Sequence, residues 1–275
     1  MFPGATCVVV AFHRPALLEG LLEMLVDPGV EVIVVIVEDD PAIGSLSGAR
    51  ILPVTANIGY AAGINLGAAH ATADAVVFMN DDVSLDASGV LMMVARLRSG
   101  HADAVVPLVE DQDGELELAR KIPYGLAKRM QLKGEPVPRD PTPIDSAWAP
   151  IVGVHTTLLR AVPMPEDYFL YGEETEWFHR LRQRGARIEL LPTVRAVHYG
   201  GVPVVRPDKS RLMARNSVRM VRRIRGRGAA LLVWPRVVAW QSRLLLMSLV
   251  LGKGQDVMRA HAAGVRAAVG AWREI

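Results

Sequence analysis

Apolar strands that end in carboxylates are the feature of this sequence that most constrains its fold. Runs rich in β-branched apolar residues are typical of parallel strands buried on both faces. Such runs lie at residues 6–12, 31–37, 51–54 and 75–79. Helical patterns at residues 15–25 and 59–71 separate them. This alternation predicts an α/β fold with a doubly wound, mostly parallel sheet flanked by helices.

Acidic residues directly follow two of these strands. Glu38, Asp39 and Asp40 come after the second strand, and Asp81 and Asp82 come after the fourth. In open α/β sheets, ligands bind in the crevice outside the carboxyl ends of the strands. We therefore expect a ligand site at this edge of the sheet.

The segment Asn80-Asp81-Asp82 offers two carboxylates and an amide at that edge. Hard cations such as Mg²⁺ and Mn²⁺ prefer carboxylate oxygens and commonly bridge to substrate phosphates. Asn and Asp also favour solvated turns. From these residues alone, a metal site and a solvated turn are equally good interpretations.

The second half of the chain has a weaker pattern. Residues 109–143 are rich in Pro, Gly and charge, which predicts a loop-rich connection. Regular structure is expected again at residues 151–159. A helix is expected at 173–184, closed by Gly185, and short strands at 188–191 and 194–198. After Pro207 the chain becomes basic and helical to its end.

Charge is unevenly distributed, although the formal net charge is only +2. Arginines are concentrated between residues 206 and 227, and acidic residues between 31 and 176. This asymmetry favours a local anionic partner over general nucleic-acid binding, because no lysine-rich groove interleaved with aromatic residues is present.

The single cysteine, Cys7, lies in an apolar strand and is expected to be a buried core residue, which fits a reducing compartment. No signal peptide is expected, because no basic and apolar leader precedes the first strand. No apolar run reaches the length of a membrane span, and Arg236, Gln241 and Arg243 interrupt the richest stretch, residues 229–252.

Three glycines, Gly59, Gly63 and Gly67, recur at a spacing of four. This spacing puts them on one face of a helix, where a missing Cβ lets backbones approach closely. The dinucleotide-binding fingerprint has a different spacing, in a strand-to-helix turn. Taken alone, close helix–sheet packing is the favoured interpretation.

Two further motifs have both a structural and a functional interpretation. Glu173, Glu174 and Glu176 begin a predicted helix, where acidic residues favour the helix dipole, but one of them could also act as a general base. His198 ends a predicted strand, and it is either a structural residue or a metal ligand beside Asp82.

Taken in order, these segments resemble glycosyltransferase family 2, and most closely its bacterial rhamnosyltransferase-like branch. The resemblance extends over about residues 6 to 220. Its most specific segments are residues 57–67 and Tyr171-Gly-Glu-Glu-Thr-Glu-Trp177. The other matching segments are Val8-Val-Val-Ala-Phe-His-Arg-Pro15, Val37-Glu-Asp-Asp40, Asn80-Asp-Asp82, His198-Tyr-Gly-Gly201 and Arg215-Asn216.

The resemblance implies a GT-A fold and an inverting, metal-dependent glycosyltransferase. It implies that Glu174 is the catalytic base, and that Asp82 and His198 hold Mg²⁺ or Mn²⁺. It also implies which residues bind the nucleotide-sugar donor: Asp39, Asn57, Gly59, Gly63, Asn65, Asn80 and Asp81. Residues 1–225 would form the catalytic domain, with a nucleotide-sugar half at 1–108 and an acceptor half at 109–225. Residues 226–275 would form a helical extension.

The sequence departs from the family pattern at several of these positions. His13 stands where an asparagine is usual, Asp40 replaces the asparagine of an Asp-Asn pair, and Asn80 replaces an acid, as is common in this branch. Glu174 stands where aspartate is usual. The Gln-x-x-Arg-Trp signature of processive polysaccharide synthases is missing, so we expect one sugar to be added per encounter.

The expected function is transfer of a sugar to a hydroxyl of a glycan, glycolipid or small molecule in polysaccharide or cell-envelope biosynthesis. The rhamnosyltransferase-like branch makes dTDP-rhamnose the first candidate donor, with a UDP-sugar second. A nucleotidyltransferase and a catalytically silent nucleotide-sugar-binding protein are the alternatives. A nicotinamide-dependent oxidoreductase is disfavoured by the glycine spacing and by the acid after the fourth strand.

The C-terminal helices combine a basic cluster, from Arg219 to Arg227, with the apolar residues 231–251. This combination suits an anionic membrane surface or a lipid-diphosphate acceptor. Packing on the catalytic domain or homodimer formation is an equally good interpretation. The expected location is the cytoplasm, with the inner face of the cell membrane as an option.

Overall fold

A computed structural model describes residues 4–37, 43, 47–116, 137–147, 150–200 and 207–275. Its first half alternates strands and helices as the sequence predicts. The strands are β1 (Ala5–Ala11), β2 (Val30–Ile36), β3 (Arg50–Pro53) and β4 (Ala75–Asn80), and the helices between them are α1 (Pro15–Met24) and α3 (Tyr60–His70). Residues 38–42, which include the predicted donor residue Asp39, lie outside the described residues.

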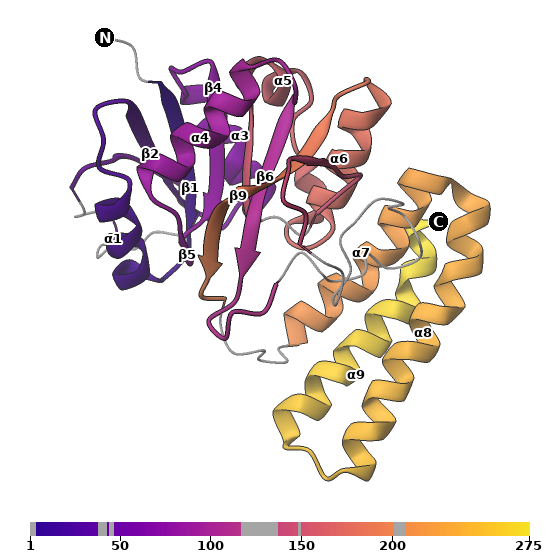
Figure 1. The fold of residues 1–275 in the computed structure, drawn as a ribbon. Coiled ribbons are helices and arrows are strands. Elements are labelled where there is room, and N and C mark those ends of the chain that lie inside the picture. Colours follow the sequence, from indigo (N-terminus) through magenta and orange to yellow (C-terminus); the bar gives the residue numbers. More distant parts are fainter. Residues whose placement is uncertain (1–3, 38–42, 44–46, 117–136, 148–149, 201–206) are drawn as a thin grey trace. The chain divides into compact units, whose positions relative to one another are not determined.

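The described strands form one sheet with helices on both faces, which confirms the predicted fold class (Figure 1). Its order is β3-β2-β1-β4-β8-β6-β9-β5, with β7 paired to β9. β1 pairs in parallel with both β2 and β4, and β2 pairs in parallel with β3. The carboxyl ends of β1 and β4 therefore lie next to each other at one edge of the sheet.

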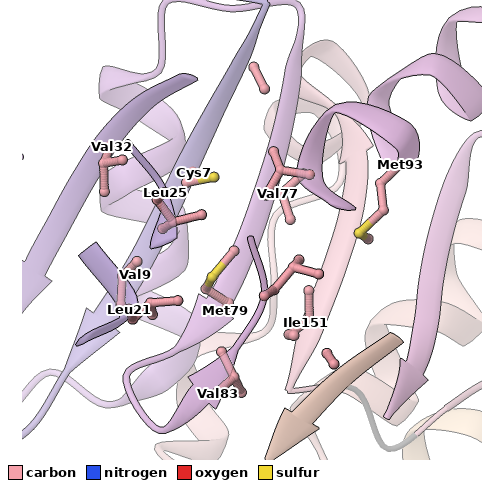
Figure 2. Close-up of a cluster of buried hydrophobic side chains, with 14 of the residues drawn as sticks. Cys7, Val9, Leu21, Leu25, Val32, Val77, Met79, Val83, Met93 and Ile151 are labelled. Atoms are coloured by element: carbon pink, nitrogen blue, oxygen red, sulfur yellow. The ribbon is translucent and has the colours of Figure 1, made fainter. Parts of the chain in front are cut away.

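Alternate residues of the central strands face opposite sides of the sheet, as strand geometry requires. Cys7 and Val9 of β1 join Val77 and Met79 of β4 in a buried cluster with side chains of α1. Figure 2 shows this cluster, in which Leu21 of α1 and Leu25, the residue after that helix, are also labelled. Because Cys7 is fully buried, its predicted place in the core is confirmed.

The opposite face of β1 packs against α3 through glycines. An added Cβ on Gly67 would lie 2.3 Å from Cγ1 of Val8, and one on Gly63 would lie 3.0 Å from Cγ1 of Val10. Neither position has room for a side chain, so the glycine spacing serves the close helix–sheet packing that the sequence favours.

The second half of the sheet is mixed. The added strands are β5 (Val83–Ser84), β6 (Ala104–Glu110), β7 (Thr142–Pro143), β8 (Ile151–His155) and β9 (Ile188–His198). β8 pairs antiparallel with β4 and β6, whereas β6 and β9 are parallel. The helices here are α4 (Ala87–Arg98), α5 (Thr156–Ala161) and α6 (Glu173–Gln183), with a 3₁₀ turn, η3 (Glu166–Tyr168).

β9 is one strand, where the sequence predicts two. Leu191 pairs with Pro107, but the next residue of β6, Leu108, pairs with Arg195. Residues 192–194 therefore form a bulge, which lets Pro192 stay in the strand without interrupting its pairing with β6. The bulge carries β9 on to His198.

The described chain divides into two compact units. The first contains residues up to 116, 137–169 and 177–200. The second contains residues 170–176 and the helices α7 (Pro207–Arg225), α8 (Arg227–Val250) and α9 (Gln255–Gly270), with a final 3₁₀ turn, η4 (Ala271–Glu274). α7 thus clusters with the C-terminal helices. The predicted domain division after residue 225 stays a prediction.

The helices of the second unit pack on one another, and α8 and α9 run antiparallel as a hairpin (Figure 1). Among the described residues, no helix combines the length and apolarity that a membrane crossing requires.

The close α3–β1 packing generates a stability prediction. Gly67→Ala should lower the free energy of unfolding by about 1–3 kcal/mol, because the new methyl group overpacks a core that contains Val8. Gly20→Ala in α1 is the matched control. No atom lies near its added Cβ, so it should stabilise the protein by about 0.5–1 kcal/mol. Urea unfolding measures both changes. Equal effects of the two variants would contradict the packing argument.

Candidate active site

Two buried carboxylates follow β4. Asp81 is 6% exposed and Asp82 is 5% exposed. Oδ2 of Asp81 accepts a hydrogen bond of 2.7 Å from the backbone N–H of Phe12, the residue after β1. The Asp81 side chain therefore joins the carboxyl ends of two neighbouring parallel strands, where a ligand site is expected.

Asp82 is brought next to His198, as the sequence predicts for a shared site. Its Oδ1 lies 3.2 Å from Nε2 of His198, and the backbone N–H of Tyr199 donates to the Asp82 carbonyl at 2.7 Å. The pairing of β5 with β9 produces this contact, because Val83 stands opposite His198. β9 therefore supplies the histidine from a part of the chain far from β4 in sequence.

A cation that the sequence analysis did not single out also contacts Asp82. The guanidinium of Arg14 forms an ion pair with Oδ2 of Asp82. Arg14 is the second residue after the end of the first predicted strand. Its place at the carboxyl end of that strand, where a ligand site is expected, is the sequence feature that could have indicated its role. The two residues are 68 positions apart in sequence, so local pattern alone does not reveal the pair.

The two carboxylates have different electrostatic environments. Burial raises the pKa of Asp81 to about 6. The negative charge of Asp82 also raises this pKa, whereas the hydrogen bond from Phe12 lowers it. Burial also raises the pKa of Asp82. The hydrogen bond and charge of His198, together with the charge of Arg14, outweigh that effect and hold the Asp82 pKa below its ordinary value. Asp82 is therefore the more acidic of the two carboxylates.

The Asp82–His198 pair fits a divalent metal by the chemistry of its donor atoms. A carboxylate oxygen and an imidazole nitrogen are both accepted by Mn²⁺, and Mg²⁺ takes the carboxylate. The described part of the chain contains no cluster of three or more His, Cys, Asp or Glu side chains suited to a metal. A cation held here would therefore need oxygens from a bound phosphate or from water to complete its coordination.

The predicted donor residues at the start of α3 have structural contacts of their own. Oδ1 of Asn57 accepts from the N–H of Gly59 at 3.0 Å, which forms the turn into the helix. Gly59 has a φ of 81°, and a Cβ there would lie 2.4 Å from the carbonyl oxygen of Phe169. The N–H of Tyr60 donates to that same carbonyl at 3.1 Å. A side chain at position 59 would therefore separate the helix start from Phe169.

Asn65 fastens the middle of α3 to the segment before η3. Its Nδ2 donates to the Met164 carbonyl at 2.9 Å and to Oε1 of Glu166 at 2.8 Å, and its Oδ1 accepts from the Met164 N–H at 3.0 Å. The backbone N–H of Asn80 donates to the Pro150 carbonyl at 3.0 Å. Donor contacts by Asn57, Gly59, Gly63, Asn65, Asn80 and Asp81 stay predictions.

The three glutamates that begin α6 have three different environments. Glu173 and Glu176, three residues apart on one helix face, are 2% and 3% exposed. Nη1 of Arg223 lies 3.4 Å from Oε2 of Glu176. Oε2 of Glu173 finds no hydrogen-bond partner within the described residues. Glu174 is partly exposed. Glu174 is therefore the only one of the three that is not a buried residue.

Burial shifts the titration of two of these glutamates. Burial, followed by the charge of the neighbouring Glu174, raises the pKa of Glu173 well above its ordinary value. Burial raises the pKa of Glu174 to about 7. A group with a pKa near neutrality can both accept and release a proton under physiological conditions, as a general base must. Glu174 has this property together with partial exposure.

The turn before α6 is held by a buried asparagine to which the sequence analysis gave no role. Phe169 and Tyr171 have φ values of 66° and 70°, which non-glycine residues seldom adopt. Asn216 of α7 is 1% exposed, and its Nδ2 donates to the carbonyls of Leu170 and Tyr171 at 2.8 and 2.9 Å. Its side-chain amide thus fixes the backbone that leads into Glu173 and Glu174. The sequence feature that could have indicated this role is the resemblance of Arg215-Asn216 to the family pattern.

The first unit also has a shallow groove of about 740 Å³. It is formed by Ile58, Ala62, Asn65, Leu66, Glu166 and Asp167. Asn65 is the only predicted donor residue in its lining, and neither the acids after β4 nor His198 contribute to it.

A comparison with protein families finds one match, to the family model described as glycosyl transferase family 2, over residues 6–144. This range includes β1 to β4, α3, Asp81 and Asp82. No curated protein matches the sequence significantly.

Several solved structures resemble this one. GalNAc-T7, solved with UDP, GalNAc and Mn²⁺, matches 98% of this chain with a TM-score of 0.62 at 12% identity, and this chain spans 56% of its length. A mannosyltransferase, PcManGT from Pyrobaculum calidifontis, solved with GDP-Man and Mn²⁺, matches 98% of this chain with a TM-score of 0.56 at 15% identity. This chain spans 87% of that protein.

Residues 1–349 of TarS from S. aureus match 97% of this chain with a TM-score of 0.56 at 13% identity, and 91% of the TarS chain is covered. At these identities the likeness concerns the fold. It confirms the GT-A architecture that the sequence resemblance implies.

The raised pKa of Glu174 predicts a pH-dependent stability. Its folded-state pKa of about 7 lies above the ordinary 4.5, so the folded protein holds the proton more tightly than the unfolded chain. Wild type should therefore lose stability as pH rises from about 4.5 to 7. Glu174→Gln removes this loss, and its advantage over wild type should grow through that window and then level off.

Urea unfolding of both proteins across this pH range measures the difference. Glu19→Gln, at an exposed glutamate of α1, controls for the loss of a glutamate as such. A stability difference between wild type and Glu174→Gln that does not change with pH would contradict the assignment.

Proposed function

This chain belongs to glycosyl transferase family 2, and we propose that it moves one sugar from a nucleotide-diphosphate sugar to an acceptor hydroxyl, with inversion at the anomeric carbon. The observation that carries the proposal is the buried, ionised Asp82 beside His198 at the carboxyl edge of the parallel strands. Donors of this class carry a diphosphate, which requires positive charge at its binding site.

Asp82 and His198 are proposed to hold Mg²⁺ or Mn²⁺. When bound, the cation would neutralise the charge that develops on the departing nucleoside diphosphate. The choice is supported by the Mn²⁺ in the structures of GalNAc-T7 and of the P. calidifontis mannosyltransferase. Asp82 contributes an ionised oxygen, and the antiparallel pairing of β5 with β9 keeps His198 beside it.

Glu174 is proposed as the base. The acceptor oxygen forms a bond to the anomeric carbon while the bond from that carbon to the diphosphate oxygen breaks, and the acceptor's proton passes to the Glu174 carboxylate. One displacement of this kind inverts the configuration. The pKa of about 7 and the partial exposure of Glu174 support this role. Glu176 is paired with Arg223, and Glu173 is buried, with a pKa that burial raises well above its ordinary value.

The donor site is proposed to include Asp39, Asn57, Gly59, Gly63, Asn65, Asn80 and Asp81, on the resemblance to the family. dTDP-rhamnose is the first candidate and a UDP-sugar the second, because the motifs are most similar to the rhamnosyltransferase-like branch. A thermal-shift screen of nucleoside diphosphates with Mn²⁺ tests which nucleotide base the donor carries, since a ligand that binds only the native state raises the stability of the protein.

The acceptor is proposed to be a glycan, glycolipid or small molecule in polysaccharide or cell-envelope biosynthesis. The helices after Gly226 are proposed to contact either a membrane, at its cytoplasmic face, or a second copy of the chain. A nucleotidyltransferase is separated from this function by its products, because it releases pyrophosphate. A catalytically silent sugar-nucleotide binder would show no donor hydrolysis in the presence of metal.

The metal proposal predicts a specific loss. Asp82→Ala should abolish transfer with the protein still folded, and the thermal shift produced by a nucleoside diphosphate with Mn²⁺ should shrink in the same variant. Circular dichroism checks the fold, and Asp113→Asn, at an exposed aspartate, is the control. Full activity in excess chelator would rule out the metal.

The base proposal predicts an order among the three glutamates. Glu174→Gln should lower transfer by about a hundredfold or more, the low end of what a general base contributes, with nearly normal donor binding. Glu173→Gln should lower it less, and Glu176→Gln least. The wild-type rate should rise with pH through about 7, because only ionised Glu174 accepts the proton.

Initial rates across pH, with donor binding measured separately, test this order. Near-normal turnover by Glu174→Gln together with an inactive Glu173→Gln would move the base to the neighbouring residue.

A further inference from the structure

One end of α8 exposes a dense set of apolar side chains. The side of α8 that packs within its unit carries small or medium residues: Ala230, Val233, Val237, Gln241 and Ser248 are buried. Near the turn to α9, the large side chains are exposed and do not belong to this packed side of the helix. We call this set the hairpin end; it consists of Leu246, Met247, Leu249, Val250 and Leu251, which are 45–76% exposed.

Exposure of this kind calls for a partner. Single exposed apolar residues are normal on a protein surface, but here five of six consecutive positions carry large, exposed apolar side chains, and such a concentration is typical of interaction sites. The described helices include none that could cross a membrane. A partner of the hairpin end therefore meets it at a surface.

The charge around the hairpin end is almost entirely positive. Residues 227–275 contain seven Arg or Lys and only two acidic residues, which gives a formal net charge of +5 with His neutral. α8 itself contains no Asp or Glu. Arg243, Lys253 and Arg259, the basic residues nearest to the hairpin end in sequence, are all exposed.

The two acidic residues of this segment leave that charge in excess. Asp256 lies 3.5 Å from Arg259, and Glu274 is taken by Arg219 of α7 at 2.8 Å. Asp256 is the one acidic residue near the hairpin end in sequence, against three basic residues, Arg243, Lys253 and Arg259, so the charge beside the apolar side chains is net positive.

The combination of exposed apolar side chains with net positive charge decides between the two proposed partners, a membrane and a second copy of the chain. In a symmetric dimer through this face, each copy would meet the same surface of the other, so like charges would face each other. An anionic bilayer accepts both features, because basic side chains bind lipid phosphates while the apolar side chains enter the acyl boundary. Charge complementarity thus favours the bilayer.

We propose that the hairpin end inserts into the surface of an anionic lipid bilayer. The inference deepens the proposed function, on which it rests only for its biological meaning: a bilayer-bound enzyme meets acceptors that are lipids, which selects the glycolipid among the three acceptor classes. Binding itself requires neither donor nor catalysis, so its test is independent of Asp82 and Glu174.

The test uses a matched pair of exposed valines. Val250 in the hairpin end is 76% exposed, and Val26 in the first unit is 79% exposed. Val250→Asp places a charge in the proposed bilayer contact, and Val26→Asp makes the same change elsewhere. Neither residue is buried, so both variants should fold, which circular dichroism checks. Co-sedimentation of the full chain with phosphatidylglycerol-containing and pure phosphatidylcholine vesicles measures binding.

Wild type and Val26→Asp should bind the anionic vesicles at low salt and lose binding at high salt. Val250→Asp should bind about tenfold less, since an apolar side chain that leaves water contributes at least that factor. Failure of wild type to bind, or equal binding by Val250→Asp, would overturn the proposal. A wild-type dimer that Val250→Asp converts to monomer, without vesicle binding, would assign the hairpin end to a second copy.

Discussion

An ionised carboxylate cannot be buried without a positive partner, and the arrangement at the end of β4 follows from this constraint. Asp82 is 5% exposed and keeps a low pKa because Arg14 and His198 flank it. The two partners come from opposite ends of the folded sequence, one just after β1 and the other at the end of β9. In the neighbouring Asp81, burial outweighs the hydrogen bond from Phe12 and the charge of Arg14, and the pKa is raised to about 6. The lower pKa favours Asp82 as the carboxylate that would meet a cation.

Much of this fold could be predicted from the sequence because its signals are local. The β-branched runs, the helix that begins at Pro15 and the glycine spacing of α3 each depend on neighbouring residues, and the structure contains the predicted elements. β9 was predicted as two strands, at residues 188–191 and 194–198; the bulge opposite β6 lets one strand continue through Pro192. That bulge depends on a pairing between residues far apart in sequence, Pro107 with Leu191 and Leu108 with Arg195, which no local pattern contains.

The candidate site was predictable only in part for the same reason. Asp82 and His198 were paired through the family resemblance, and the structure brings them together. The contacts of Arg14 with Asp82, and of Asn216 with the turn before α6, join segments far apart in sequence, so their roles appear only after folding. Three glutamates that look equivalent in sequence differ because Arg223 reaches one of them, burial isolates another, and the third remains partly exposed.

The ion pair between Arg14 and Asp82 has a consequence for how such a protein is made. Because an internal guanidinium already satisfies the buried carboxylate, folding of this unit does not have to wait for a metal ion. Chains that build a site from unpaired acidic ligands depend on metal supply during synthesis, since binding energy and folding energy are then the same quantity. Here the proposed cation would meet a carboxylate that Arg14 already satisfies, so its binding would not be needed for the chain to fold.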